Sequence, residues 1–126
     1  MSAPDPYSEL VTRLFRATPG AGRASGSEWV SGAAAEPLSG SVIRWHLRAA
    51  AGRIEEARYE VRGCPHTIAA AALIAAELTG RPIAAVELDL PDIARRLGAP
   101  VTKMGRFFVI QDALRKALLL LEPGTA

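Results

Sequence analysis

The chain has 126 residues, a formal net charge of +2 and a single cysteine. This length predicts one domain over residues 1–126, and the scattered cations exclude the basic blocks typical of nucleic-acid-binding proteins. No apolar run is long enough to span a membrane, and the first residues lack the pattern of a signal peptide, so we expect a soluble, cytoplasmic protein.

The N-terminal third is predicted to contain one helix and one strand. Apolar residues recur at helical spacing over residues 5–17, and Pro6 is acceptable in the first turn of that helix. Glycine and proline interrupt any period over residues 19–26, which predicts a loop. Residues 27–35 then have the pattern of a weak strand, and residues 36–40 that of a turn.

Two clearer strands follow. Residues 41–48 and residues 53–61 both alternate apolar and charged side chains, the pattern of half-buried strands. The short connection between them contains Gly52, so we expect an antiparallel hairpin whose solvent face pairs arginines with glutamates. His46 falls on this charged face and is therefore expected to be exposed to solvent.

The rest of the chain is predicted to be helical. Residues 67–79 are apolar on nearly every side, which indicates a buried helix that ends at Gly80. Short helices are expected at residues 82–87 and 91–97, and a longer amphipathic helix at residues 105–121. The order of elements predicts an α+β fold with a three-stranded antiparallel sheet and helices packed mainly on one of its faces.

The single cysteine, Cys64, lies at the junction between the third strand and the buried helix. A helix N-terminus favours the thiolate, and His66 could add a second metal ligand or a cation. The alternative is that Cys64 is a small buried residue, because free cysteines are commonly buried. One cysteine and two histidines supply neither a hydrolase pattern nor a complete zinc site, so we predict no enzymatic activity.

The order of elements and several local motifs resemble the U-type iron–sulfur cluster scaffold proteins, IscU and the N-terminal domain of NifU. The resemblance covers nearly the whole chain. Its motifs are the loop "EPLSG", the strand that ends at Gly63 and Cys64, the alanine-rich helix that ends at Gly80, "DIARRLGAPVTK" and "QDALRKAL". It implies the same α+β fold and a role in iron–sulfur cluster assembly.

The cluster ligands are where this chain departs from that family, which uses three cysteines plus an aspartate or histidine. The resemblance places Ser39 at one cysteine and Ser41 at the aspartate. It places Gly105 at the histidine and Arg106 at the last cysteine, so that Cys64 alone keeps its ligand type. Protonated arginine has no lone pair to offer, and iron in clusters is held chiefly by thiolates. The resemblance therefore implies a degenerate site, with these residues gathered around Cys64.

The sequence is compatible with three functions. A labile cluster could be held by Cys64 and His66 from two subunits, or Cys64 could carry sulfur as a persulfide. Ligand chemistry favours a third function, in which this chain keeps the fold but has lost cluster chemistry and acts as a partner or regulator in assembly. The cofactor is accordingly an iron–sulfur cluster, another metal ion, or none.

The resemblance also implies partners. A cysteine desulfurase or other iron–sulfur assembly proteins would bind the chain, and Pro100 and Lys103 lie in the loop that contacts a chaperone in the family. We expect neither a nucleic-acid partner nor a membrane partner, and a chain that is a monomer or a weak homodimer.

Overall fold

The structure, a computed structural model, describes residues 7–121. Over this range the elements confirm the predicted α+β fold. In chain order they are α1 (Glu9–Ala17), β1 (Trp29–Glu36), β2 (Ser41–Ala50), β3 (Arg53–Arg62), α2 (Pro65–Leu78), the 3₁₀ turn η1 (Ile83–Ala85), α3 (Leu90–Leu97), the 3₁₀ turn η2 (Val101–Lys103) and α4 (Met104–Leu120).

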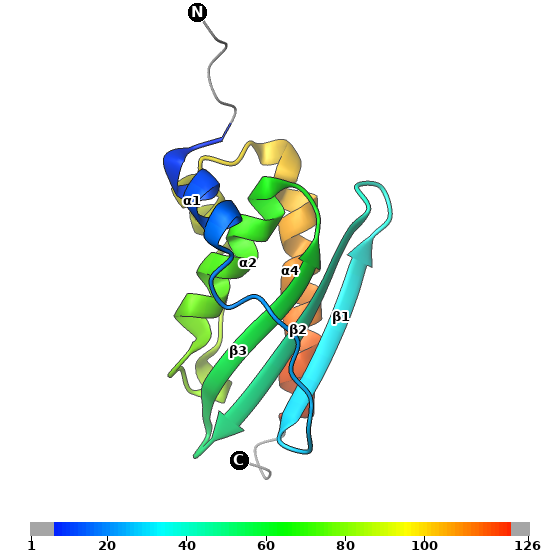
Figure 1. Cartoon of the computed structure of the whole chain (residues 1–126), viewed down its shortest axis with the longest axis vertical. Coiled ribbons are helices and arrows are strands. Elements are labelled where there is room, and N and C mark those ends of the chain that lie inside the picture. The colour runs from blue at the N-terminus through cyan, green and yellow to red at the C-terminus, as the bar shows by residue number, and fades with distance from the viewer. Residues whose placement is uncertain (1–6, 122–126) are drawn as a thin grey trace, which may run out of the picture.

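The strands form one antiparallel sheet in the order β1-β2-β3. Helices cover one face of this sheet: α4 packs against β1 and β2, and α2 packs against β3 (Figure 1). α1 lies on α2 and adds a further layer. The core therefore sits between the sheet and the pair α2 and α4.

The segment between α1 and β1 lies over the opposite face of the sheet. It is tied to the edge strand β3, because the N–H of Gly22 donates to the carbonyl oxygen of Tyr59 at 2.9 Å. It then crosses the sheet to reach β1 (Figure 1). Arg58 and Glu60 alternate with core residues along β3, and both contact Arg23 in this segment. The outward face of the sheet is thus partly covered by the chain itself.

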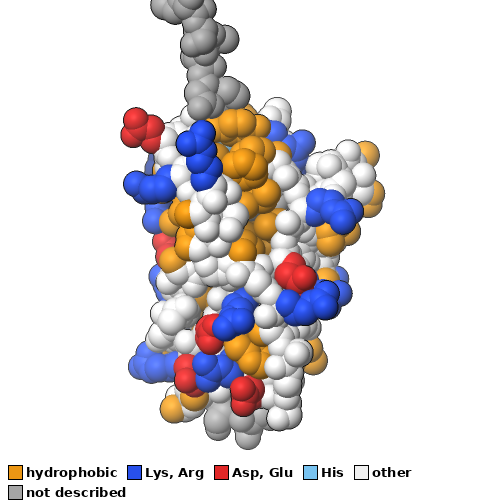
Figure 2. Space-filling view, in the orientation of Figure 1, with side chains coloured by type: hydrophobic (Ala, Val, Ile, Leu, Met, Phe, Trp, Pro, Cys, Tyr) orange, Lys and Arg blue, Asp and Glu red, His pale blue; other side chains and the backbone are white. Residues whose placement is uncertain are grey.

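The hairpin between β2 and β3 is tighter than the sequence suggested, because only Ala51 and Gly52 connect the strands. Both residues have positive φ angles, 54° and 76°, as the tight turns of twisted hairpins require. The predicted pairing of arginine with glutamate is confirmed, since Arg48 contacts Glu55 at 2.9 Å and Glu56 at 3.1 Å. Figure 2 shows acidic and basic side chains intermixed over the lower part of the outward face of the sheet.

Trp45 links the central strand to the last helix. Its ring is fully buried and meets Tyr59 edge to face, with ring centroids 5.8 Å apart. Its Nε1–H donates to the backbone carbonyl oxygen of Ile110 in α4 at 3.1 Å. A buried indole N–H needs such a partner, so this bond fixes α4 relative to β2 while it satisfies the donor.

The main error of the sequence-based prediction concerns the exposure of His46. We expected it to be solvent-exposed, but only 3% of its surface is accessible. It lies on the central strand, between Ser31 of β1 and Glu60 of β3, and it is hydrogen-bonded to both. Neighbouring strands on both sides and the crossing segment above explain its burial, which the alternation of polar residues alone does not reveal.

Some element boundaries also differ. The helix predicted over residues 82–87 is wrong, because only the short 3₁₀ turn η1 forms after Pro82. α3 begins one residue before Pro91, and Asp89 caps it by accepting the N–H of Asp92 at 3.0 Å. Residues 5 and 6 of the predicted first helix lie outside the described residues. None of the helices in the described part is long and apolar enough to cross a membrane.

The backbones of β1 and α4 come very close together at Gly32 in β1. A Cβ at this position would lie 2.4 Å from the backbone nitrogen of Ala117 and 2.5 Å from the carbonyl oxygen of Ala113. Both atoms belong to the backbone of α4, so no side-chain rotation could relieve the clash. Glycine is therefore required for α4 to lie as close to the sheet as it does.

Replacing Gly32 by alanine is expected to lower the free energy of unfolding by about 3 kcal/mol, because the added methyl overpacks a contact between two backbones. Urea unfolding measures this change. Gly105→Ala is the control, since a Cβ there meets open space and the helix gains about 0.5–1 kcal/mol from losing a glycine. Equal stability of Gly32→Ala and the parent chain would contradict the close contact.

Candidate functional site

Cys64 lies where β3 gives way to α2, and tight packing fixes the backbone there. A Cβ on the preceding Gly63 would approach Thr67 Cβ to 3.1 Å and Ser41 Oγ to 3.3 Å, closer than ordinary van der Waals contact. Cys64 is the N-cap of α2, with extended backbone, and Pro65 takes the first helical position. The thiol is therefore held at a helix N-terminus, close to the start of β2.

Two cations and a hydroxyl surround the sulfur. Arg106 Nη1 donates to Cys64 Sγ at 3.2 Å, and Lys103 Nζ lies 3.8 Å from the same atom. The hydroxyl of Thr67, one turn into α2, is 3.3 Å from Sγ. Arg106 lies in the first turn of α4 and Lys103 immediately precedes that helix, so the start of α4 delivers both cations to the thiol.

These neighbours change the acidity of the thiol. Burial is the largest single influence and raises the pKa of Cys64. Hydrogen bonds from the Thr67 side chain and backbone, the Arg106 bond and the charge of Lys103 oppose it and bring the pKa from 9.0 down to about 7. About half of the thiol is then ionised at neutral pH. Because the thiolate is the reactive form, Cys64 has the character of a nucleophile.

The turn between β1 and β2 brings Ser39 and Ser41 to the same end of the sheet. Ser39 Oγ donates to Ser41 Oγ at 2.9 Å, and Ser41 Oγ is the atom packed near the junction at Gly63. Glu36 accepts the N–H groups of Leu38 and Ser39 at 3.1 and 2.6 Å. Its pKa is lowered, chiefly by the bonds from Ser39. These polar groups are already engaged within the turn.

His66 has a different environment from Cys64. It is 3% exposed, and its ring meets that of Tyr7 with centroids 4.9 Å apart. Neither ring nitrogen has a hydrogen-bond partner among the described residues, so His66 shares no hydrogen bond with the thiol. Burial, followed by the charges of Lys103 and Arg106, lowers its pKa and favours the neutral imidazole.

The remaining predicted positions flank the thiol. Gly105 precedes Arg106 in α4 and faces open space. Pro100 is the N-cap of η2, the turn that carries Lys103 towards the sulfur. The structure thus brings Arg106 and Lys103 into contact with Cys64. Ser41 Oγ packs close to Gly63, the residue before Cys64, and Ser39 is hydrogen-bonded to Ser41.

An iron–sulfur cluster does not fit this donor set. The described residues include no group of three or more His, Cys, Asp or Glu side chains placed to hold a metal ion. The thiol has two cations as neighbours, and positive charge there opposes a bound metal cation. Iron in clusters is held chiefly by thiolates, whereas Cys64 provides one. The arrangement instead favours an ionised thiol or another anion.

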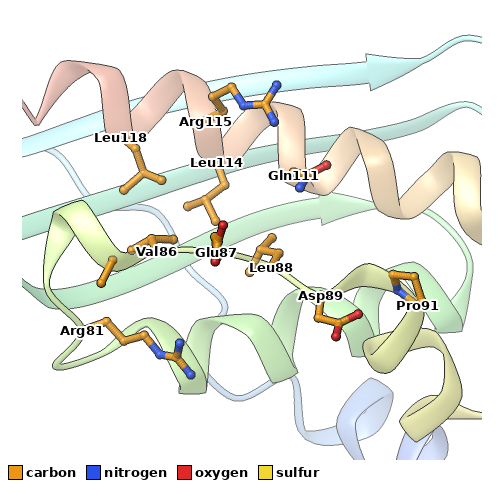
Figure 3. Close-up of a pocket in the computed structure, with 11 residues that line it drawn as sticks. Arg81, Val86, Glu87, Leu88, Asp89, Pro91, Gln111, Leu114, Arg115 and Leu118 are labelled. Atoms are coloured by element: carbon orange, nitrogen blue, oxygen red, sulfur yellow. The ribbon is translucent and has the colours of Figure 1, made fainter.

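A large groove lies elsewhere on the molecule. Its volume is about 790 Å³, and it runs between the segment from Arg81 to Pro91 and one side of α4 (Figure 3). Arg81 and Arg115 stand on its two walls, with aliphatic side chains between them. It shares no lining residue with the cluster around Cys64 and holds no thiol or imidazole. The chemistry therefore points to Cys64 as the candidate site, not to the groove.

Sequence reasoning missed two neighbours of the sulfur. Thr67 was not assigned, although it stands three residues after Cys64, the spacing at which an N-cap residue meets the first helical turn. Lys103 was assigned only to a partner-binding loop. Lys103 precedes Arg106 by three residues, about one helical turn. This spacing could have indicated that the two cations lie on one side of the start of α4.

Comparison with known proteins gives consistent results. The family model described as "NifU-like N terminal domain" matches residues 6–122. A candidate iron–sulfur cluster assembly scaffold protein for the SUF system from Fervidobacterium islandicum AW-1 has a similar structure, with a TM-score of 0.71 and 14% identity over 89% of this chain and 96% of that one.

A second solved structure is also similar. It is the N-terminal part of a nitrogen-fixing NifU-like protein from Brucella abortus, with a TM-score of 0.58 and 14% identity over 87% of this chain and 92% of that one. At such identities the likeness shows the fold alone. A search of curated proteins found no significant match.

Arg106→Gln is expected to raise the pKa of Cys64, because it removes a cationic hydrogen-bond donor from the thiolate. The pH dependence of iodoacetamide labelling in the native state measures this. The parent chain should show a midpoint of about 7. An upward shift of about one unit lowers the thiolate fraction at pH 7 roughly fivefold.

Arg115→Gln is the matched control, because it removes an arginine from the same helix away from the sulfur. Its labelling profile should equal that of the parent chain. A Cys64 that reacts only after unfolding, or a midpoint unchanged by Arg106→Gln, would contradict the role given to the guanidinium.

Proposed function

The chain belongs to the NifU-like N terminal domain family, whose model matches nearly all of it, and we propose that it acts in iron–sulfur cluster assembly as an accessory of the scaffold type. In this role it binds assembly proteins but holds no cluster of its own. Family membership supports the assembly role, and the chemistry around Cys64 supports the accessory role.

The contact between Arg106 and Cys64 is the observation that carries this proposal. Arg106 stands where the resemblance expects the last cysteine ligand, and its guanidinium lies 3.2 Å from the sulfur. A guanidinium offers no lone pair, and it neutralises the thiolate charge that a metal would otherwise attract. The position that would complete the ligand set is thus occupied by a group that competes with the metal.

Exposed apolar residues near the thiol support a protein partner. Leu38 is 97% exposed in the turn that also holds Ser39, and Val101 is 85% exposed in η2, next to Pro100. Isolated exposed apolar side chains are ordinary, but these two lie on the two turns that flank the candidate site. A cysteine desulfurase or another assembly protein that presents apolar and acidic groups would complement this surface, because Lys103 and Arg106 make it cationic.

A second function is favoured by the acidity of the thiol. With a pKa of about 7, Cys64 can act as a persulfide carrier. Its thiolate attacks the terminal sulfur of a donor persulfide, the donor S–S bond breaks, and the donor leaves as a thiolate. Cys64 then holds one extra sulfur, and the charges of Arg106 and Lys103 stabilise the persulfide anion.

Anaerobic incubation with iron and sulfide tests the accessory role. The parent chain should form no stoichiometric cluster, as read by visible absorption and acid-labile sulfide. The combined variant Ser39→Cys, Ser41→Asp and Arg106→Cys should gain cluster binding, because it supplies two further thiolates and a carboxylate around Cys64 and removes the guanidinium.

The matched control adds the same number of thiols elsewhere, as Ser25→Cys with Arg115→Cys, and should gain no cluster. Circular dichroism confirms that each variant is folded. The accessory role is excluded if the parent chain binds a stoichiometric cluster that Cys64→Ala abolishes.

The persulfide function predicts one extra sulfur on Cys64 after incubation with glutathione persulfide or with a cysteine desulfurase and cysteine. Intact mass and peptide mapping detect it. Cys64→Ala should show none, and Arg106→Gln should show less at neutral pH because its thiolate fraction is lower. Failure of both donors to modify a folded parent chain would reject this function and leave the accessory role standing.

A further inference from the structure

A second polar cluster lies on the outward face of the sheet, away from Cys64. Ser31 of β1, His46 of β2 and Glu60 of β3 form a hydrogen-bonded line across the three strands. Ser31 Oγ is 2.7 Å from His46 Nδ1, and His46 Nε2 is 2.7 Å from Glu60 Oε1. We name these residues the Ser31–His46–Glu60 relay.

The strand register places the relay. Ser31 is directly opposite His46 in the pairing of β1 with β2. Arg58 is directly opposite His46 on the other side, and Glu60 is two residues further along β3, on the same face. Diagonal neighbours of this kind lie within reach of long side chains. Three strands therefore hold the three groups on a rigid frame, and His46 is almost fully buried within it.

The partners of His46 decide its tautomer. The pKa of Glu60 is lowered, chiefly by the bond to His46, so this carboxyl is ionised at neutral pH and can only accept hydrogen bonds. Nε2 of a neutral imidazole must then carry the hydrogen and donate it to Glu60. Nδ1 is left with its lone pair towards Ser31, and the serine hydroxyl donates to it.

A cationic cavity begins at the carboxylate end of the relay. Its volume is about 390 Å³, and Glu60 forms part of its wall. Arg23, Arg44 and Arg62 also line it, so three arginines share the cavity with a single carboxylate, and Arg23 is paired with Glu60 at 3.7 Å. Arg44 is the next outward residue along β2 from His46. The surplus of positive charge favours an anionic ligand beside the relay.

We propose that Ser31 is a nucleophile for acyl transfer, that His46 is its general base and Glu60 the residue that orients His46, and that the substrates are small acyl esters carrying a negative charge. A nucleophile bonded to a base that is itself held by a third group is the arrangement that activates a serine hydroxyl. This site is independent of Cys64, and it departs from the expectation of no enzymatic activity.

The reaction balances with these groups and water. Ser31 Oγ bonds to the acyl carbon while its proton passes to His46 Nδ1, and Glu60 stabilises the imidazolium. The bond from the acyl carbon to the leaving alcohol breaks, and the alcohol takes the proton from Nδ1. Water then attacks the Ser31 ester, Nδ1 accepts its proton and returns it to Ser31, and a carboxylic acid is released.

The relay also stabilises the sheet, because it satisfies a buried imidazole and joins three strands. A purely structural relay would lower stability when mutated but would leave Ser31 unreactive. The two accounts therefore differ in the reactivity of Ser31, not in the effect on folding. A direct measurement of that reactivity decides between them.

The test uses p-nitrophenyl acetate and is carried out in the full-length Cys64→Ala chain, because the thiolate of Cys64 would itself accept the acetyl group. The release of p-nitrophenolate is followed by absorbance, and peptide mapping locates the acetyl group. We expect acetylation of Ser31, which Ser31→Ala abolishes. His46→Gln should slow the reaction about 100-fold, the usual contribution of a general base.

Ser25→Ala is the matched control, because Ser25 is an exposed serine in the crossing segment. It should react as the Cys64→Ala chain does. Urea unfolding of each variant shows whether it is folded under the assay conditions, and Glu60→Gln offers a milder change if His46→Gln unfolds. The absence of acetyl-Ser31 would overturn the proposal. So would folded His46→Gln and Glu60→Gln variants that react as fast as the Cys64→Ala chain.

A second arm tests the substrate class. Mono-p-nitrophenyl succinate carries a carboxylate, and it should react faster than the neutral acetate. Arg44→Gln should reduce this preference, because it removes one arginine from the cavity. If Arg44→Gln leaves the preference for the succinate ester unchanged, the cationic cavity does not bind the negative charge of the substrate. The reaction with the acetate tests separately whether Ser31 is the nucleophile. Both arms are read in a chain without Cys64, so their failure leaves the proposed assembly function untouched.

Discussion

The backbone contact between β1 and α4 is the constraint on which the arrangement of the molecule depends. Because Gly32 has no side chain, the peptide groups around Ala113 and Ala117 can lie directly on the strand. The bond from Trp45 Nε1 to the carbonyl oxygen of Ile110 fixes the same helix against β2. With α4 held at two points along its length, its first turn has little freedom, and Arg106 is carried to the sulfur of Cys64.

The sheet therefore separates two polar sites that are built in different ways. On the helical side, at one end of the sheet, a thiol is ionised by cations that come from a distant part of the sequence. On the outward side, a histidine is buried by strands adjacent in the chain and by the segment that precedes them. The first site depends on how α4 docks, and the second on the register of the three strands.

Much of the fold could be predicted because period and turn chemistry act locally. The alternation in β2 and β3, the apolar surface of α2 and the glycine after it indicated those elements correctly. His46 was misplaced because alternation assigns a face and not a depth, and depth depends on chain that crosses from elsewhere. The 3₁₀ turn after Pro82 was mistaken for a helix because so short an apolar segment has too few residues to distinguish the two.

The ionisation of Cys64 gives its surroundings a charge that varies with pH. Arg106 and Lys103 each carry a positive charge, whereas the thiol, with a pKa of about 7, loses its proton near neutral pH. In mildly acidic solution the three groups together are doubly positive, and in mildly alkaline solution they are singly positive. An acidic surface that docks there would be held more tightly as pH falls, so the junction can couple the protonation of one sulfur atom to the strength of an association.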